Sequence, residues 1–151
     1  MRSRWTALLA VLVLVGLSPQ RGDAQSGPPQ TPPRQTVQGG LKQNYPNPFN
    51  PETTIPFTVG DFPTCSDRSR RYTVSITILN VLSQKYAVPV LEGGGVGGGR
   101  PLQKLQLECG EYKAFWDGYV LNTRQKAASG IYSVVLEIDD RRFGMKMSVK
   151  K

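Results

Sequence analysis

The chain of 151 residues contains no histidine and only two cysteines. Histidine is the commonest general acid and base in enzymes, and without it Cys65 and Cys109 have no imidazole to activate them as nucleophiles. Two cysteines are also too few for a structural zinc site. We therefore expect no catalytic residues, no bound metal and no cofactor.

Other catalytic signatures are missing as well. The nucleophile-elbow pattern Gly-x-Ser-x-Gly is absent, and the only adjacent carboxylates are Asp139 and Asp140 in a predicted hairpin turn. The glycine tract of residues 93–100 lacks the lysine and the helix of a phosphate-binding loop, so we interpret it as a flexible connection. Asp117 alone supplies too few oxygens for calcium, and a buried Trp116 followed by an Asp-Gly turn is the expected structure.

The chain has one long apolar run, at residues 6–16, and it follows the basic residues Arg2 and Arg4. Small residues at Gly22 and Ala24 complete the pattern of a secretory signal peptide over residues 1–24. A membrane-spanning helix, the alternative, needs about 20 apolar residues. We therefore expect export and no transmembrane segment after cleavage of the signal.

Acidic side chains are outnumbered, with 19 basic against 11 acidic in the whole chain. The basic residues are scattered, and the densest group, DRSRR at residues 67–71, has no interleaved aromatics. An exported protein also rarely meets nucleic acid, so we expect no nucleic-acid partner. The charge favours a soluble surface able to approach anionic envelope lipids or polysaccharides.

An oxidising compartment allows Cys65 and Cys109 to pair. Closing a loop of this length stabilises a fold by about 4 kcal/mol in the chain-entropy treatment. Two free buried thiols are the alternative.

Residues 25–40, rich in Pro, Gln, Gly and Thr, have little to bury and are predicted to form a disordered linker. The remaining residues, 41–151, suffice for one domain. Here the hydrophobic period is two, which is typical of half-buried strands. Seven strands are predicted, at 53–60, 72–79, 85–91, 102–109, 111–116, 130–138 and 142–150. An all-β fold follows, an immunoglobulin-like antiparallel β-sandwich of about seven strands.

The alternation predicts which side chains face the core. The expected inward residues are Ile55, Phe57, Val59, Val74, Ile76, Ile78, Leu105, Leu107, Cys109, Tyr112, Ala114, Trp116, Tyr132, Val134, Leu136, Ile138, Phe143, Met145, Met147 and Val149. Pro56 and Pro89 cannot donate to a ladder, so we expect their strands at sheet edges.

A stiff stretch, QNYPNPFNPETTIPFTV at residues 43–59, precedes and includes the first predicted strand. Each proline fixes its own φ and holds its predecessor extended, so the segment loses little entropy on docking. Tyr45 and Phe49 are predicted to plug the open end of the sandwich. A polyproline ligand for a partner's groove is the alternative.

Five motifs carry a family resemblance: LKQNYPNPFNPETTIPFTV, VSITILNVLSQ, WDG, ASGIYSVVLEI and KMSVKK. In order and spacing they resemble the C-terminal sorting domain of type IX secretion cargo and its relative, the Ig-like domain of the flagellar hook-capping protein. The resemblance covers residues 41–151. It implies a β-sandwich that rides at the end of a larger exported protein, is recognised by an outer-membrane translocon, and is cut off as cargo is fixed to the cell surface.

Carried over residue by residue, the resemblance also implies a set of recognition residues. They are Asn44, Pro46, Asn47, Pro48, Phe49, Trp116, Asp117, Gly118, Gly130, Tyr132, Lys146 and Met147. Turn, plug and core roles would explain the same residues without a receptor.

The sequence thus predicts a non-enzymatic exported module, secreted or held at the outer cell surface of a bacterium, that acts as a sorting and attachment signal. Its partner would be the secretion machinery or another surface component. The alternative is a free-standing structural or adhesive domain, periplasmic or released, that binds a protein or glycan.

Overall fold

The computed structural model describes residues 39–93 and 97–151. The predicted signal peptide, residues 1–24, and all but the last two residues of the predicted linker lie outside these ranges. No helix within the described part of the chain has the length and apolar character needed to cross a bilayer.

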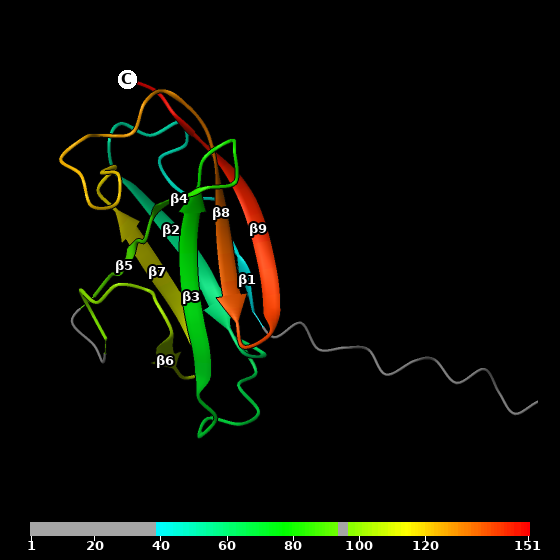
Figure 1. Ribbon diagram of the computed structural model, residues 1–151. Helices are drawn as coiled ribbons and strands as arrows, with labels where there is room; N and C mark the ends of the chain where they lie inside the picture. Colours follow the sequence, from blue (N-terminus) through cyan, green and yellow to red (C-terminus); the bar gives the residue numbers. More distant parts are fainter. Residues whose placement is uncertain (1–38, 94–96) are drawn as a thin grey trace, which may run out of the picture. The chain divides into compact units, whose positions relative to one another are not determined.

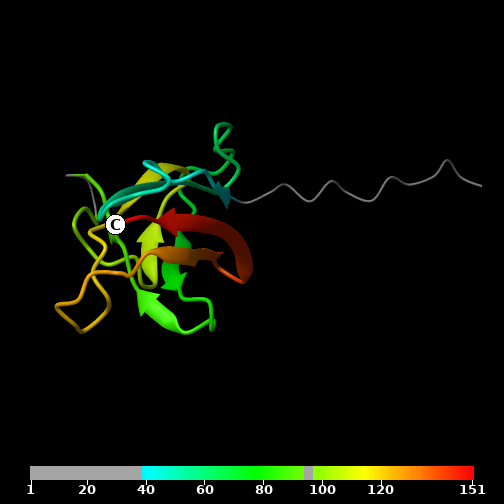
Figure 2. The ribbon, with the colours of Figure 1, turned by 90° about the horizontal axis from the view of Figure 1, so that it is seen from above.

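The described residues form two antiparallel sheets that pack face to face (Figure 1), and the view from above separates β1 and β2 from β8 and β9 (Figure 2). The first sheet has the order β1-β2-β7-β5, from Gly39–Leu41, Thr53–Val59, Gly110–Trp116 and Val90–Leu91. The second has the order β4-β3-β8-β9, from Lys85–Ala87, Tyr72–Leu79, Gly130–Ile138 and Arg141–Val149; β6, Leu105–Leu107, also pairs with β3. The predicted all-β sandwich is confirmed.

The core follows the alternation of the sequence. Of the 20 expected inward side chains, 16 are buried, and the other four (Cys109, Tyr112, Phe143 and Met145) are partly buried and pack against the core. In β3 every second residue is buried and its neighbours are half exposed. Burial of aliphatic side chains from both layers is the main stabilising contribution.

The strand count differs from the prediction, because the described residues form nine strands rather than about seven. The predicted strand 85–91 divides: β4 pairs with β3 in one sheet and β5 pairs with β7 in the other. The chain crosses between layers at Val88 and Pro89, and the carbonyl of Pro89 accepts a hydrogen bond from Leu102 N at 2.9 Å. Both pieces lie at the ends of their sheet orders, as expected beside Pro89.

The expected edge position of Pro56 is wrong, since β2 lies between β1 and β7. Lys42 N donates to the Pro56 carbonyl at 2.9 Å, so the nitrogen of Pro56 also faces the side of β1. There β1 has already ended at Leu41. A proline is tolerated in this inner strand because it lies opposite Lys42, just beyond the end of β1, where the missing N–H removes one hydrogen bond at the end of the ladder rather than in its middle. The two glycines at 39 and 40 already pair with β2, ahead of the expected domain start at residue 41.

Two local features agree with the sequence. Asp139 and Asp140 form the turn of the β8–β9 hairpin, in which Ile138 pairs with Arg141. Cys65 and Cys109 form a disulfide with a Cα–Cα distance of 5.5 Å, which rules out the alternative of two free thiols in this structure.

Candidate functional site

The motif segments, widely separated in the sequence, meet at one end of the sandwich. We call it the motif end and define it as residues 43–54, 79–89, 115–132 and 146–151. Register pairs join its parts: Thr53 with Trp116, Tyr132 with Met147, and Gly130 with Val149. It lies at the top in Figure 1, where β3 ends and β8 begins.

Asn44 holds the start of the Asn-Pro segment. Its side chain is buried, and Nδ2 donates to Thr53 Oγ1 at 2.9 Å and to the Pro46 carbonyl at 3.0 Å. Thr53 Oγ1 in turn lies 3.2 Å from the Tyr45 carbonyl and 3.1 Å from that of Pro46. These bonds satisfy polar groups that could not otherwise be buried without cost. Asn44 therefore fixes a turn and offers no atom to a partner.

A row of four aromatic side chains fills the interior of the motif end. Phe49, 1% exposed, meets Trp116 edge to face with ring centroids 5.4 Å apart. Trp116 meets Tyr132 at 5.9 Å, and Tyr132 meets Tyr86 at 5.0 Å. The predicted plug is thus confirmed for Phe49. It is wrong for Tyr45, whose side chain is 49% exposed.

Tyr132, the third aromatic residue of this row, has a hydroxyl that donates to the Ala128 carbonyl at 2.9 Å. Burial, followed by the neighbouring Tyr86 hydroxyl, raises the pKa of Tyr132 to about 12. The side chain therefore remains neutral at physiological pH. Tyr86 was not singled out in the sequence, since its strand is too short to display an alternation.

Trp116 is buried, and Asp117 and Gly118 form a turn after it, as the sequence predicted. Trp116 Nε1 donates to the Tyr119 carbonyl at 2.9 Å, and Tyr119 N donates to Asp117 Oδ1 at 3.0 Å. Gly118 has φ +79°, and a Cβ there would lie 2.2 Å from the Pro51 carbonyl oxygen. Only glycine adopts this positive φ without strain and leaves room for the Pro51 carbonyl. Within the described ranges there is no group of three or more potential metal-binding side chains, here or elsewhere.

The Asn-Pro segment also covers the last part of β9. Phe49 N donates to the Ser148 carbonyl at 3.0 Å, Lys150 N donates to the Phe49 carbonyl at 3.0 Å, and Asn47 Oδ1 accepts from Ser148 N at 3.0 Å. Along a strand alternate residues direct their N–H and C=O to the same side. The main chain of Lys146 and Gly144 therefore faces outward, and it has no partner among residues 39–93 and 97–151.

The twelve residues implied by the resemblance divide evenly by exposure. Six are buried: Asn44, Phe49, Trp116, Gly118, Tyr132 and Met147. Six are exposed: Pro46, Asn47, Pro48, Asp117, Gly130 and Lys146. The buried six build the motif end, so only the exposed six are placed to touch a partner.

Comparison with family models, with curated proteins and with solved structures found no match.

The opposite end of the sandwich carries the disulfide and most of the acidic residues. Asp61 accepts hydrogen bonds from the Ser66 hydroxyl and amide, and these bonds hold the pKa of its carboxyl below the usual value. Arg71 pairs with Glu108, and Arg70 pairs with Asp139. These contacts tie the loop of residues 61–71 to the sheets.

Proposed function

We propose that the domain is a non-enzymatic exported module that serves as a secretion and surface-attachment signal, recognised by an outer-membrane translocon in the manner of the sorting domains it resembles. The convergence of the motif segments on one end of the sandwich supports this proposal. Residues about 100 positions apart, such as Asn47 and Ser148, are hydrogen-bonded there. A partner would meet them as one surface.

Rigidity is the second property that such a signal needs. The prolines at 46 and 48 are exposed, yet their segment is fixed on both sides by Asn44 and Phe49. A surface ordered before binding avoids much of the entropic cost of association. The six buried motif residues thus contribute to recognition without touching the partner, because they hold the six exposed motif residues in place.

The outer edge of β9 offers a mode of binding. The outward-facing main chain of Gly144 and Lys146 can pair with an extended strand of the partner, and side chains beside it supply specificity. Phe49 closes this edge beyond Ser148, which would fix where an added strand ends.

The experiment is a fusion of residues 25–151 behind a reporter that carries its own export signal, produced in a bacterium with type IX machinery. We expect the reporter to reach the cell surface, where antibody detects it on intact cells. The same fusion should remain inside cells whose translocon has been deleted. Periplasmic retention of a folded fusion in the intact strain would contradict the proposal.

Matched variants locate the recognised end. Lys146→Glu changes an exposed charge at the open edge of β9, whereas Arg68→Glu makes the same change in the loop of the opposite end. We expect display to fall with Lys146→Glu and to persist with Arg68→Glu. Equal display of both folded variants would mean that the translocon does not recognise the motif end.

A further inference from the structure

Two large apolar side chains project into solvent from the turn between β3 and β4. Val81 is 78% exposed and Leu82 is 73% exposed. The turn is held by Asn80, whose Oδ1 accepts from Leu82 N and Gln84 N at 3.0 Å, while its Nδ2 donates to Gln84 Oε1 at 3.0 Å. Turn positions usually carry small or polar residues. Val81 and Leu82 therefore do not pack in the core, although the turn that carries them is fixed by the hydrogen bonds of Asn80.

The surroundings of this turn are apolar and basic. Ile131, 49% exposed, lies at the same end of β8. One row below the turn, register pairs join Lys85 with Leu79, Leu79 with Ser133, and Ser133 with Lys146. The four side chains of this row stand on the outer face of the sheet, with a lysine at either end. The apolar turn is thus flanked by two positive charges.

Charge divides unequally between the motif end and the rest of the described residues. The motif end has six basic side chains (Lys85, Arg124, Lys126, Lys146, Lys150 and Lys151) and two acidic ones (Glu52 and Asp117). The remaining described residues have nine basic and eight acidic side chains. The ion pairs Lys42–Glu111, Arg70–Asp139, Arg71–Glu108 and Arg142–Glu137 use only residues outside the motif end.

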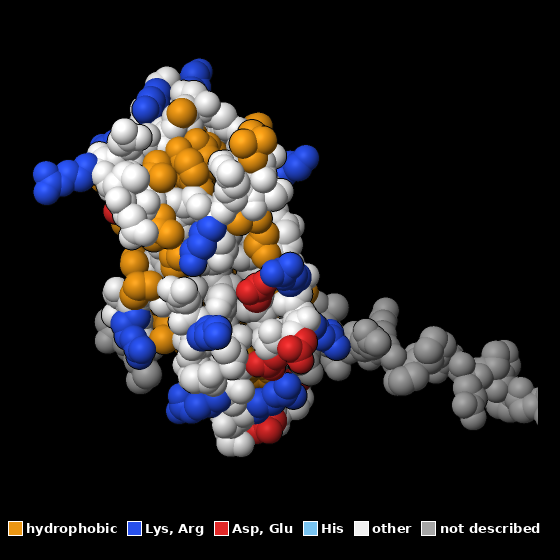
Figure 3. Space-filling view, in the orientation of Figure 1, with side chains coloured by type: hydrophobic (Ala, Val, Ile, Leu, Met, Phe, Trp, Pro, Cys, Tyr) orange, Lys and Arg blue, Asp and Glu red, His pale blue; other side chains and the backbone are white. Residues whose placement is uncertain are grey.

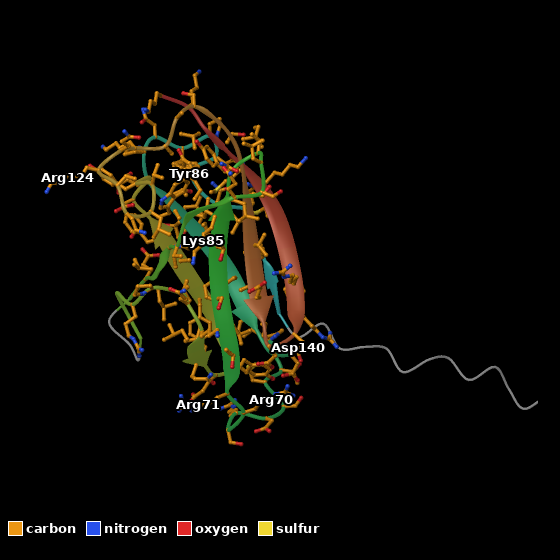
Figure 4. The ribbon with its side chains drawn as sticks, viewed as in Figure 1. Arg70, Arg71, Lys85, Tyr86, Arg124 and Asp140 are labelled. Carbon is orange, nitrogen blue, oxygen red and sulfur yellow. A yellow bond between two sulfur atoms is a disulfide. The ribbon has the colours of Figure 1, made fainter. Side chains whose placement is uncertain are left out.

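The views of the surface agree with this division. In Figure 3 hydrophobic side chains gather in the upper half of the face, and acidic side chains lie mainly in the lower half. Figure 4 places Arg124 and Tyr86 at the motif end, and Arg70, Arg71 and Asp140 at the other. Arg124 projects away from the body of the domain.

We propose that the motif end docks on an anionic lipid surface, with Val81 and Leu82 entering the headgroup region and the six basic side chains facing the phosphates. Net positive charge beside exposed apolar side chains matches the two attractions that hold peripheral proteins on such a surface. The apolar residues stand on a projecting turn, a shape that suits a deformable bilayer more than a preformed groove. This proposal does not depend on recognition by a translocon.

A second loop of the motif end supplies a further contact. Tyr119 and Leu121 are each 40% exposed, and Lys126 Nζ lies 5.4 Å from the centre of the Tyr119 ring. Tyrosine is enriched at the boundary between lipid and water because its ring is apolar and its hydroxyl polar. Leu121 N donates to the Tyr86 carbonyl at 2.8 Å, which ties this loop to β4. The β3–β4 turn and the loop that carries Tyr119 and Leu121 are thus connected through β4, and both expose apolar side chains.

The test is co-sedimentation of residues 25–151 with vesicles, since this piece keeps every described core residue and omits the apolar leader, which would itself bind lipid. We expect binding to vesicles of phosphatidylglycerol and phosphatidylcholine, and little binding to phosphatidylcholine alone. Val81→Ser with Leu82→Ser should weaken binding about tenfold or more, because both side chains lose their apolar burial. Lys85→Glu should weaken it severalfold and reduce its dependence on salt.

Matched controls use the opposite end. Phe62 is a partly exposed apolar residue beside the disulfide, and Arg68 is an exposed base, so Phe62→Ser and Arg68→Glu repeat the same changes in chemistry. We expect both controls to bind as the parent does. The proposal is overturned if anionic vesicles are not bound, if the turn variant binds as tightly as the parent, or if the turn serves only a protein partner and lipid binding is absent. All changed side chains are at least partly exposed, so folding should persist, as circular dichroism will verify.

Discussion

Replacement of Phe49 by alanine tests whether the Asn-Pro segment is part of the core. The side chain is 1% exposed and meets Trp116 edge to face at 5.4 Å. Truncation of a buried phenylalanine costs about 3–5 kcal/mol of unfolding free energy. Phe49 lies outside the main strands, held by one bridge to Val149, so its surroundings can partly collapse. We therefore expect a loss of about 3 kcal/mol, a large share of the stability of a small domain.

The assay is urea unfolding of residues 25–151 followed by tryptophan fluorescence. Trp116 is the only tryptophan in this piece, and it touches the substituted ring, so the signal reports on the site itself. Glu52→Ala, a change at an exposed residue of the same segment, is the control and should alter stability by less than about 0.5 kcal/mol. A loss below about 1 kcal/mol for Phe49→Ala would refute the assignment of Phe49 to the core.

Two further predictions concern the disulfide and Tyr132. Reduction of the Cys65–Cys109 bond should lower the free energy of unfolding by up to about 4 kcal/mol, and identical urea curves with and without reductant would contradict this. The pKa of Tyr132 is raised to about 12 from a usual 10.0, so its stabilising contribution is complete below pH 10 and is lost as pH rises through 12. Tyr132→Phe should flatten the fall in stability over this interval, and an unchanged pH profile would show that another group is responsible.

The terminal hairpin shows what the sequence can predict. In β8 and β9 the alternation extends over nine residues each, and two aspartates mark the turn, so pairing and the inward face both follow. The division of residues 85–91 could not be predicted in this way. A strand of two or three residues is too short to reveal its sheet, which depends on its pairing partners: Leu79, one turn earlier, for Lys85, and Phe115, further along the chain, for Val90.

The motif end was predictable only in part, for a similar reason. Tyr45 and Phe49 are both aromatic and both lie next to a proline in the sequence. Only Phe49 packs against Trp116. Local stiffness restricts the backbone without deciding which side chain meets the core. Val81 and Leu82 are the converse case, since hydropathy alone would assign them to the interior.

The proposed role of the domain as an exported binding module is tested most directly by fractionation of the native cell with an antibody raised against residues 41–151. We predict that the protein lies on the outer cell surface or in the medium, accessible to the antibody on intact cells. A protein found only in the cytoplasm would contradict export, and one confined to the periplasm would contradict surface attachment.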